Sequence, residues 1–242
     1  MTDKQQTNDK EGLEFAHTQL RKTHRAEDIS EIVRQGILNG YWKPDDKIND
    51  QELSERLGVS RLTVRDALSK LVERGIVDNK YWKGYIVHRL NWQEIESIID
   101  VRIALEEIAL RKIMELLTPE IIVDLDKCIK TCEEKLTSHS FDEFFDWDYG
   151  HLFHKILYRG SGNTIIPQIM ENLNFQITVI RLLEVSKKSE RDEENIRAHR
   201  SIFSRIKKGD TEKAVDLLRK HLYKHKDRVR AEYMSIYGEQ TE

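Results

Sequence analysis

The chain has 242 residues, of which 38% are hydrophobic and 34% charged, and its formal net charge is −3 at pH 7. This length allows one large domain or two smaller ones, and the low Pro and Gly counts, 3 and 11, favour helices with short connections over a β-rich fold. No apolar run reaches the roughly 18 residues of a membrane span, so we expect no membrane partner. Residues 1–22 are polar and lack the apolar core of a secretory signal, so we expect a disordered arm and cytoplasmic residence by default.

The first predicted elements are two helices separated by a turn. Residues 25–39 repeat apolar side chains at helical spacing, and Gly40 ends that pattern. The segment YWKPDDKIN, with Pro44, is typical of a turn. Asp50 is the expected N-cap of a second helix, which Gly58 ends.

A third helix and a hairpin follow. Ser60 is the expected N-cap of a helix from Arg61 to about Arg74, and the apolar stripe of that helix predicts one buried face. The segment IVDNKYWKGYIVHRL is typical of two short strands around Lys83–Gly84. Two helices joined by a tight turn and followed by a β-hairpin predict a winged helix-turn-helix DNA-binding domain over residues 23–90.

Positive charge is concentrated in this segment. Residues 56–89 hold eight Lys and Arg against three Asp and Glu, a net +5 on an acidic chain. The second helix of a helix-turn-helix lies in the major groove of DNA, and Arg61, Thr63 and Arg65 lie in its first turns. Arginine can donate two hydrogen bonds to guanine, and helix N-termini suit phosphates. These features predict DNA binding, whereas for two arginines alone an ordinary solvated face would be the simpler interpretation.

The segment GVSRLTVRDALSKLVERG, residues 58–75, resembles the pattern GVSR-x-x-VR-x-AL-x-x-L-x-x-x-G of the GntR family of bacterial transcription regulators. Upstream, ILNGYWKPDDKINDQELSERL is similar to the family's first and second helices. The chain departs from the family at Asp45, where Gly is usual, and at Leu62–Thr63, where Thr-Pro is common. The resemblance implies DNA contacts and a wing tip that enters the minor groove. With the cap Ser60, the candidate DNA-binding residues are Gln51, Ser60, Arg61, Thr63, Arg65, Lys83 and Gly84.

Residues 91–237 are expected to form an all-α domain. No strand alternation follows Trp92, and helical patterns span about 92–117, 119–137, 141–159, 163–187, 190–208 and 211–235. The predicted fold class is therefore mainly α, with an N-terminal winged helix-turn-helix that includes a small β-hairpin and a C-terminal helical bundle.

Several histidines fall on these predicted helices. His151 and His154 are three residues apart, His199 lies on a later helix, and His221 and His225 are four residues apart on the last one. Imidazoles from several helices that face one bundle core can bind a divalent metal. From spacing alone, polar core or surface positions are the alternative.

This half is similar to the FadR-like effector domain of the GntR family, called FCD. The matching pieces are VRIALE (101–106), FHKILYRGSGN (153–163), AHRSIFSRIKKGD (198–210) and RKHL (219–222). Many such domains hold a metal with three histidines and one aspartate, and the histidine positions correspond to His154, His199 and His221. The aspartate position is Gly150 here, which has no ligand atom.

A replacement ligand is expected from the same helix. His151 lies about 60° from His154 on a helical wheel, and Asp148 about 120°. His151 is therefore the expected fourth ligand and Asp148 the alternative, with water or effector in that position otherwise. Imidazole ligands favour a divalent transition metal such as Zn or Ni over Mg or Ca.

Arg102 corresponds to the arginine of the family's V-R-x-x-L-E helix, which often faces the effector pocket. An arginine beside a metal can bind a carboxylate through two hydrogen bonds, so the expected effector is a small organic acid. The alternative is a structural ion pair with Glu106, one helical turn away.

These features together predict a transcription regulator and not an enzyme. We expect a homodimer, assembled through the helical domain, that binds a palindromic double-stranded operator and responds to a carboxylate effector beside a metal. One alternative is a regulator for which the metal itself is the signal. A three-His metalloenzyme is a further alternative, but no catalytic base can be assigned and the DNA-binding domain would have no role.

Overall fold

The computed structural model describes residues 26–138, 147–183 and 188–238, which divide into two compact units between Leu90 and Asn91. The arm expected over residues 1–22 lies outside the described residues. In the described part of the chain, no helix is long and apolar enough to cross a membrane.

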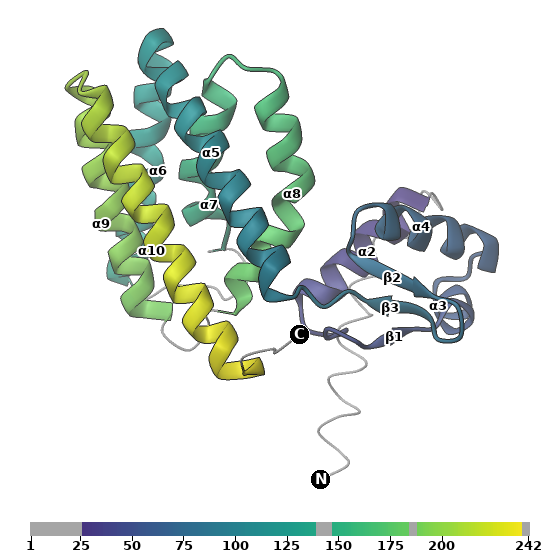
Figure 1. Cartoon of the computed structure of the whole chain (residues 1–242). Helices are drawn as coiled ribbons and strands as arrows, with labels where there is room; N and C mark the ends of the chain where they lie inside the picture. The colour runs from purple at the N-terminus through teal and green to yellow at the C-terminus, as the bar shows by residue number, and fades with distance from the viewer. Residues whose placement is uncertain (1–25, 139–146, 184–187, 239–242) are drawn as a thin grey trace. The chain divides into compact units, whose positions relative to one another are not determined.

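The first unit is a winged helix-turn-helix, as predicted (Figure 1). Its elements are α2 (Ala26–Leu38), β1 (Lys47–Ile48), α3 (Asp50–Leu57), α4 (Arg61–Glu73), β2 (Val77–Lys80) and β3 (Gly84–Val87). The strands form an antiparallel sheet in the order β1-β3-β2, and Lys80 pairs with Gly84 at the end of the hairpin. The sequence prediction misses β1 because a strand of two residues shows no alternation.

Side-chain caps fix the start of both helices of the helix-turn-helix. Ser60 accepts a hydrogen bond from the Thr63 N–H, as the sequence predicts for α4. The prediction for α3 is wrong by one residue, because Asn49 and not Asp50 is the N-cap and accepts from two N–H groups of the first turn. Asp50 is instead the first residue of α3, so its carboxylate is available to side chains outside that helix.

All regular elements in the described residues of the second unit are helices, which confirms the predicted all-α bundle. Its elements are α5 (Trp92–Leu116), α6 (Pro119–Ser138), α7 (Trp147–Gly160), α8 (Ile165–Leu182), α9 (Lys188–Lys207) and α10 (Thr211–Tyr237). The start predicted for α7 near residue 141 lies outside the described residues. α10 packs against α5 and α9, and α7 contacts α5, α6, α8 and α9. α7 therefore lies among the helices that can bring side chains to a shared interior.

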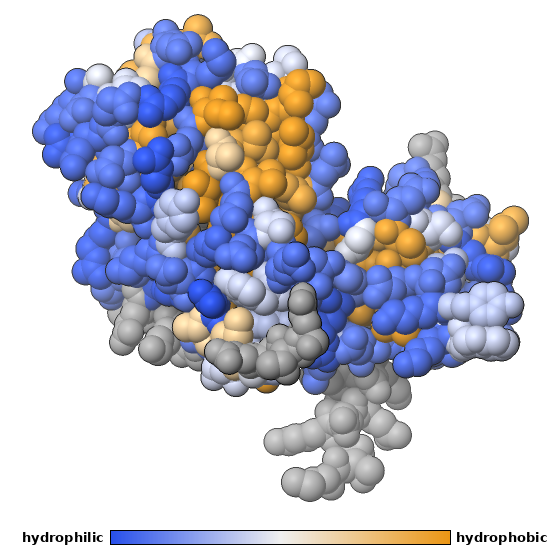
Figure 2. Space-filling model, in the orientation of Figure 1, coloured by the Kyte–Doolittle hydropathy of each residue, from blue (hydrophilic) through white to orange (hydrophobic). Residues whose placement is uncertain are grey.

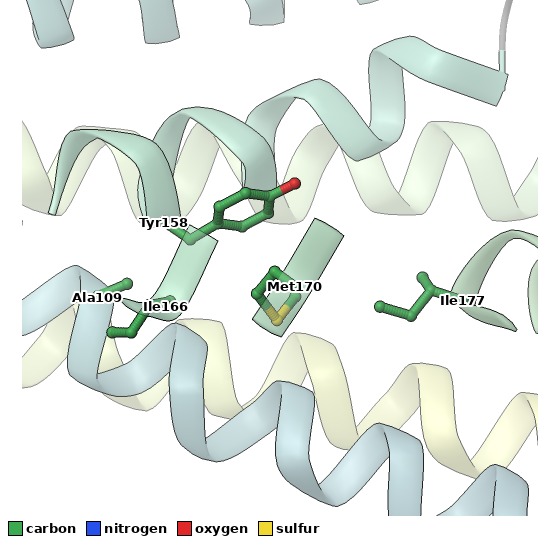
Figure 3. Close-up of a cluster of buried hydrophobic side chains, with 5 residues drawn as sticks. All are labelled: Ala109, Tyr158, Ile166, Met170 and Ile177. Atoms are coloured by element: carbon green, nitrogen blue, oxygen red, sulfur yellow. The ribbon is translucent and has the colours of Figure 1, made fainter. Parts of the chain in front are cut away.

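A cluster of apolar side chains joins α5, α7 and α8 (Figure 3). Ala109 and Met170 are fully buried, and the other members are at most 3% exposed: Tyr158, Ile166 and Ile177. Asn91 caps α5 with a reciprocal pair of hydrogen bonds that also involves Glu94, which fixes where this long helix begins. The cap and the apolar packing together set the position of α5 beside α7.

Candidate DNA-binding surface and candidate metal centre

α4 buries one side and exposes the other. Val64, Ala67 and Leu68 are fully buried, whereas the side chains of Arg61 and Arg65 are each 58% exposed. Both arginines lie in the first turns of the helix, where backbone N–H groups lack partners within the helix. The N-terminal end of α4 is therefore an exposed cationic surface with the chemistry for phosphate and base contacts.

An acidic residue of α3 holds one of these arginines. The guanidinium of Arg61 donates two hydrogen bonds to the Asp50 carboxylate, at 2.9 and 3.0 Å, whereas Arg65 Nε lies 3.9 Å from Asp50 Oδ2. The hydrogen bond from Arg61 lowers the pKa of Asp50. Of the two arginines, Arg65 therefore has the weaker interaction with Asp50. Asp50 itself belongs to this surface, although the sequence predicts it only as an N-cap.

The other candidate DNA-binding residues lie on α3 and at the turn between β2 and β3. Gln51 is exposed in the first turn of α3, and its side-chain amide donates to Glu55 at 3.1 Å. Lys83 is exposed in the turn, and Gly84 begins β3 with a φ of 75°. A residue with a Cβ would be strained at that φ, so the exit from the turn depends on glycine. Contacts of these residues with DNA stay a prediction.

Three histidines from different helices converge in the second unit. His154 of α7, His199 of α9 and His221 of α10 are each at most 9% exposed. The Nε2 atom of His199 lies 3.2 Å from that of His154 and 3.2 Å from that of His221. Tetrahedral ligands about 2.05 Å from a Zn ion are roughly 3.3 Å apart, so the spacing fits a shared cation. The residues present therefore fit the metal that the family resemblance implies.

Burial keeps these imidazoles in the form that binds metals. It is the main cause that holds the pKa values of His154, His199 and His221 well below their ordinary range. The neighbouring histidines and Arg102 lower these pKa values further, because each positive charge disfavours another. Neutral imidazoles with free lone pairs are the ligands of divalent transition metals.

Glu106 on α5 orients one of the three histidines. Its carboxylate is fully buried, and Oε2 lies 2.5 Å from Nδ1 of His154. Because a carboxylate only accepts hydrogen bonds, Nδ1 of His154 carries the proton and Nε2 presents its lone pair to the other two histidines. From the sequence, Glu106 is expected only as a partner for Arg102. Its contact with α7 spans 48 residues of sequence, so no local pattern indicates it.

Arg102 makes the ion pair that was the alternative to effector binding. Its Nε donates to Oε1 of Glu106 at 2.7 Å, and both side chains are almost fully buried. Arg102 also lines a cavity of about 30 Å³ beside the three histidines, together with Arg181, Asn195, His225 and Arg228. This volume holds about one water-sized group, so binding of an organic acid here would require side chains to move.

The predicted fourth ligand, His151, lies outside the group of histidine nitrogens that are within 4.8 Å of one another. It is 6% exposed, and among the described residues its Nε2 atom has no hydrogen-bond partner. Burial, with a smaller effect of Arg102, lowers the pKa of His151 to about 3. The side chain of the alternative ligand, Asp148, lies outside the described residues. The fourth position therefore stays a prediction.

Comparison with known proteins identifies both units. The FCD domain matches residues 97–224, and the bacterial regulatory proteins of the gntR family match residues 25–87. The transcriptional regulator YdhC of Bacillus subtilis is 28% identical over 182 residues, which cover 75% of this chain and 80% of that protein. The transcriptional repressor RspR of Escherichia coli is 25% identical over 214 residues, covering 88% and 92% of the two chains.

The same architecture occurs in a solved structure. A GntR transcriptional regulator from Rhodococcus sp. RHA1 superposes with a TM-score of 0.71 at 19% identity, over 86% of this chain and 99% of that chain. The matched domains and curated relatives are those of transcription regulators, not of enzymes.

The buried ion pair predicts that replacing Arg102 destabilises the protein more than replacing Arg219. Each arginine pairs with a glutamate of α5, Arg102 with Glu106 and Arg219 with Glu107. Arg102→Met should lower the free energy of unfolding by about 3–5 kcal/mol, because it leaves Glu106 buried without its cation. Arg219→Met should lose at most about 1 kcal/mol, since Arg219 pairs with Glu107 while its side chain is 48% exposed. Urea denaturation at one protein concentration measures both.

A double variant tests the assignment to Glu106. Arg102→Met/Glu106→Gln should lose less stability than the sum of the two single variants, because the second change removes the unpaired charge. Strict additivity of the two losses would show that Arg102 and Glu106 do not stabilise the unit as a pair.

Proposed function

The chain belongs to the GntR family of bacterial regulatory proteins and carries an FCD domain. On this premise we propose that it is a homodimeric transcription regulator, controlled by a small organic acid that binds with the help of a bound metal. Residues 23–90 would bind a palindromic DNA operator, and residues 91–237 would bind the effector and form the dimer. The convergence of three buried histidine Nε2 atoms beside Arg102 is the observation that carries the effector part of this proposal.

DNA binding is assigned to the exposed side of α4 with its neighbours on α3 and the β2–β3 turn. Arg65 is our leading candidate for a base contact, because its guanidinium is exposed and only distantly paired. Arg61 would have to exchange its hydrogen bonds with Asp50 for contacts with DNA, or keep them and support α4 from α3. The proposed surface also includes Ser60, Thr63, Gln51, Lys83 and Gly84.

His154, His199 and His221 would hold one divalent transition metal, with Zn or Ni as the leading candidates because all three ligands are nitrogen atoms. When bound, the metal would supply a positive Lewis-acid centre for an anionic ligand. His151, Asp148 or the effector itself would complete the coordination. The absence of an aspartate at Gly150 leaves the site without that negative charge, which favours a carboxylate effector.

Three arginines line the cavity beside the histidines, and their guanidinium groups can bind an anion. Arg102 and Arg228 already bind Glu106 and Glu194, so a carboxylate effector would compete with the protein's own carboxylates for their guanidinium groups. Such an exchange gives the effector different contacts from those of the unliganded state, which is the condition for a shift between two conformations. If the metal alone is the signal, titration with metal without any organic acid would change DNA affinity.

Dimer formation is assigned to an apolar surface of the second unit. Val101 and Ile108 on α5 are 44% and 47% exposed, and Ile165 and Ile169 on α8 are 56% and 36% exposed. Figure 2 shows a hydrophobic patch over this part of the helical unit. A contiguous apolar patch on a soluble domain is typical of an interface, and a two-fold dimer would place two DNA-binding units on a palindromic site.

DNA binding is tested at Arg65. A duplex selected from a random DNA pool with the full chain supplies the operator, and Arg65→Ala should weaken its binding by about 1–3 kcal/mol, or roughly 5- to 150-fold. Arg197→Ala, which removes an exposed arginine of α9 in the second unit, should bind normally. Equal affinity of wild-type protein and Arg65→Ala in a gel-shift titration would remove Arg65 from the site.

The second prediction concerns the metal. Wild-type protein incubated with Zn²⁺ and freed of excess ion should carry about one ion per chain, as measured by inductively coupled plasma mass spectrometry. His199→Ala should lose that ion, whereas His88→Ala in the first unit should keep it. His151→Ala should weaken binding without abolishing it. A wild-type protein that retains neither Zn nor Ni would contradict the metal assignment.

The third prediction concerns the dimer. Ile108→Glu places a charge in the apolar patch formed by Val101, Ile108, Ile165 and Ile169, and it should convert the protein to a monomer at micromolar concentration, as judged by light scattering. Val123→Glu changes a 62% exposed apolar residue of α6 in the same way and should leave the dimer intact. If the two variants behave alike, the interface lies elsewhere.

A further inference from the structure

Two aromatic side chains stand out at the turn between β2 and β3. Tyr81 and Trp82 are each 90% exposed, more than any other large hydrophobic side chain that the structure describes as exposed. Two other tryptophans of the described residues, Trp42 and Trp92, are half-buried. Exposing two whole rings to water does not stabilise the fold, so this exposure indicates a surface that binds a ligand.

The turn holds the rings away from the rest of the unit. The Lys83 N–H donates to the Lys80 carbonyl at 3.0 Å and closes the turn, and the Lys80–Gly84 pair is the last of the hairpin. In Figure 1 this turn lies at the end of the sheet opposite the point where α4 leads into β2. All residues from 79 to 83 are exposed, so the rings at the tip contact no core.

The two rings contact one another. Their centroids are 4.8 Å apart and their planes are at 88°, which is the edge-to-face arrangement that aromatic pairs favour. Each ring limits the rotation of the other, so less conformational freedom is lost when the pair inserts into a partner. The tip therefore presents two rings that act as one apolar projection.

Charge indicates which partner fits this projection. Lys80 and Lys83 flank the rings, and both are exposed. They belong to the segment with eight Lys and Arg against three Asp and Glu. Aromatic faces next to cations match nucleic acid, in which bases stack on rings while phosphates bind the ammonium groups. Lys80 Nζ lies 4.0 Å from the Asp78 carboxylate and its side chain is 56% exposed, so it can also reach a phosphate.

We propose that Tyr81 and Trp82 form an aromatic wedge that inserts between base pairs of the operator and partly unstacks one base step beside the segment contacted by α4. This inference rests on the DNA-binding function proposed above. Apolar side chains that insert from the minor groove unstack base steps and bend the duplex. Flexible TA or CA/TG steps deform most easily, so operators should carry such a step at the wing position although no hydrogen bond selects it.

The test uses the full chain and the duplex selected from a random pool, with 2-aminopurine placed at the candidate step. Tyr81→Ala/Trp82→Ala should bind that duplex roughly 5- to 150-fold more weakly per base stack lost, whereas Trp82→Phe, which keeps a ring, should lose much less. Wild-type protein should raise 2-aminopurine fluorescence, and the double alanine variant should not. Folding should be unaffected in all variants, because the replaced side chains are exposed.

The salt dependence separates the wedge from a charge effect. Lys80→Ala or Lys83→Ala should reduce the slope of log affinity against log salt concentration by about 1, whereas the aromatic variants should leave this slope unchanged. A reduced slope in the aromatic variants, with unchanged 2-aminopurine fluorescence, would overturn the wedge.

The remaining outcomes are distinct. If wild-type protein enriches no duplex from the pool, the proposed DNA-binding function fails and the wedge fails with it. If wild-type protein and the double alanine variant bind the duplex equally, only the wedge is overturned. Binding to phosphatidylglycerol vesicles that the double variant loses, with unchanged DNA binding, would assign the tip to a lipid surface and also overturn it.

Discussion

The arrangement of the second unit depends on the buried carboxylate of Glu106. One oxygen accepts from Arg102 on the same helix and the other lies against Nδ1 of His154 on α7. A buried charge is costly unless it is paired and hydrogen-bonded, and these two partners meet that requirement. The same contacts set the tautomer of His154, so one residue links helix packing, the guanidinium of the cavity and the histidine cluster. Changes at any of these groups would therefore affect the other two.

In the first unit, the carboxylate of Asp50, which is 15% exposed, links two helices in a comparable way. Asp50 at the start of α3 binds Arg61 at the start of α4, and so joins the ends of the two helices that form the helix-turn-helix. The Arg61 side chain is 58% exposed, so the contribution of the pair to stability is small, and its main effect is on the orientation of the guanidinium. A surface that binds DNA needs cations whose direction is set before the polyanion arrives, because ordering them on binding costs entropy.

Local patterns predicted most of the fold, and contacts between distant residues account for what they missed. Apolar spacing, with residues such as Ser60, Gly58 and Pro119, placed most of the described helix ends to within two residues, whereas α8 ends at Leu182 and not near residue 187. The N-cap of α3 was predicted as Asp50 and is Asn49, because both residue types cap helices well and residue type alone does not separate them. Glu106 could not be assigned from sequence, since its contact with His154 depends on how α5 packs against α7. The exposure of Tyr81 and Trp82 likewise depends on the direction of the hairpin.

The small cavity constrains any mechanism of response. With about 30 Å³ beside the histidines, an organic acid that reaches them would have to displace side chains. Arg102 could move only by leaving Glu106. The buried Glu106 carboxylate, which is already hydrogen-bonded to His154, would then rearrange together with that imidazole or take up another cation. An effector that binds Arg102 would then change the orientation of a histidine of the proposed metal site, and with it the contact between α5 and α7. Metal occupancy and effector affinity would be coupled through that one carboxylate, and each would change the affinity for the other by the same factor.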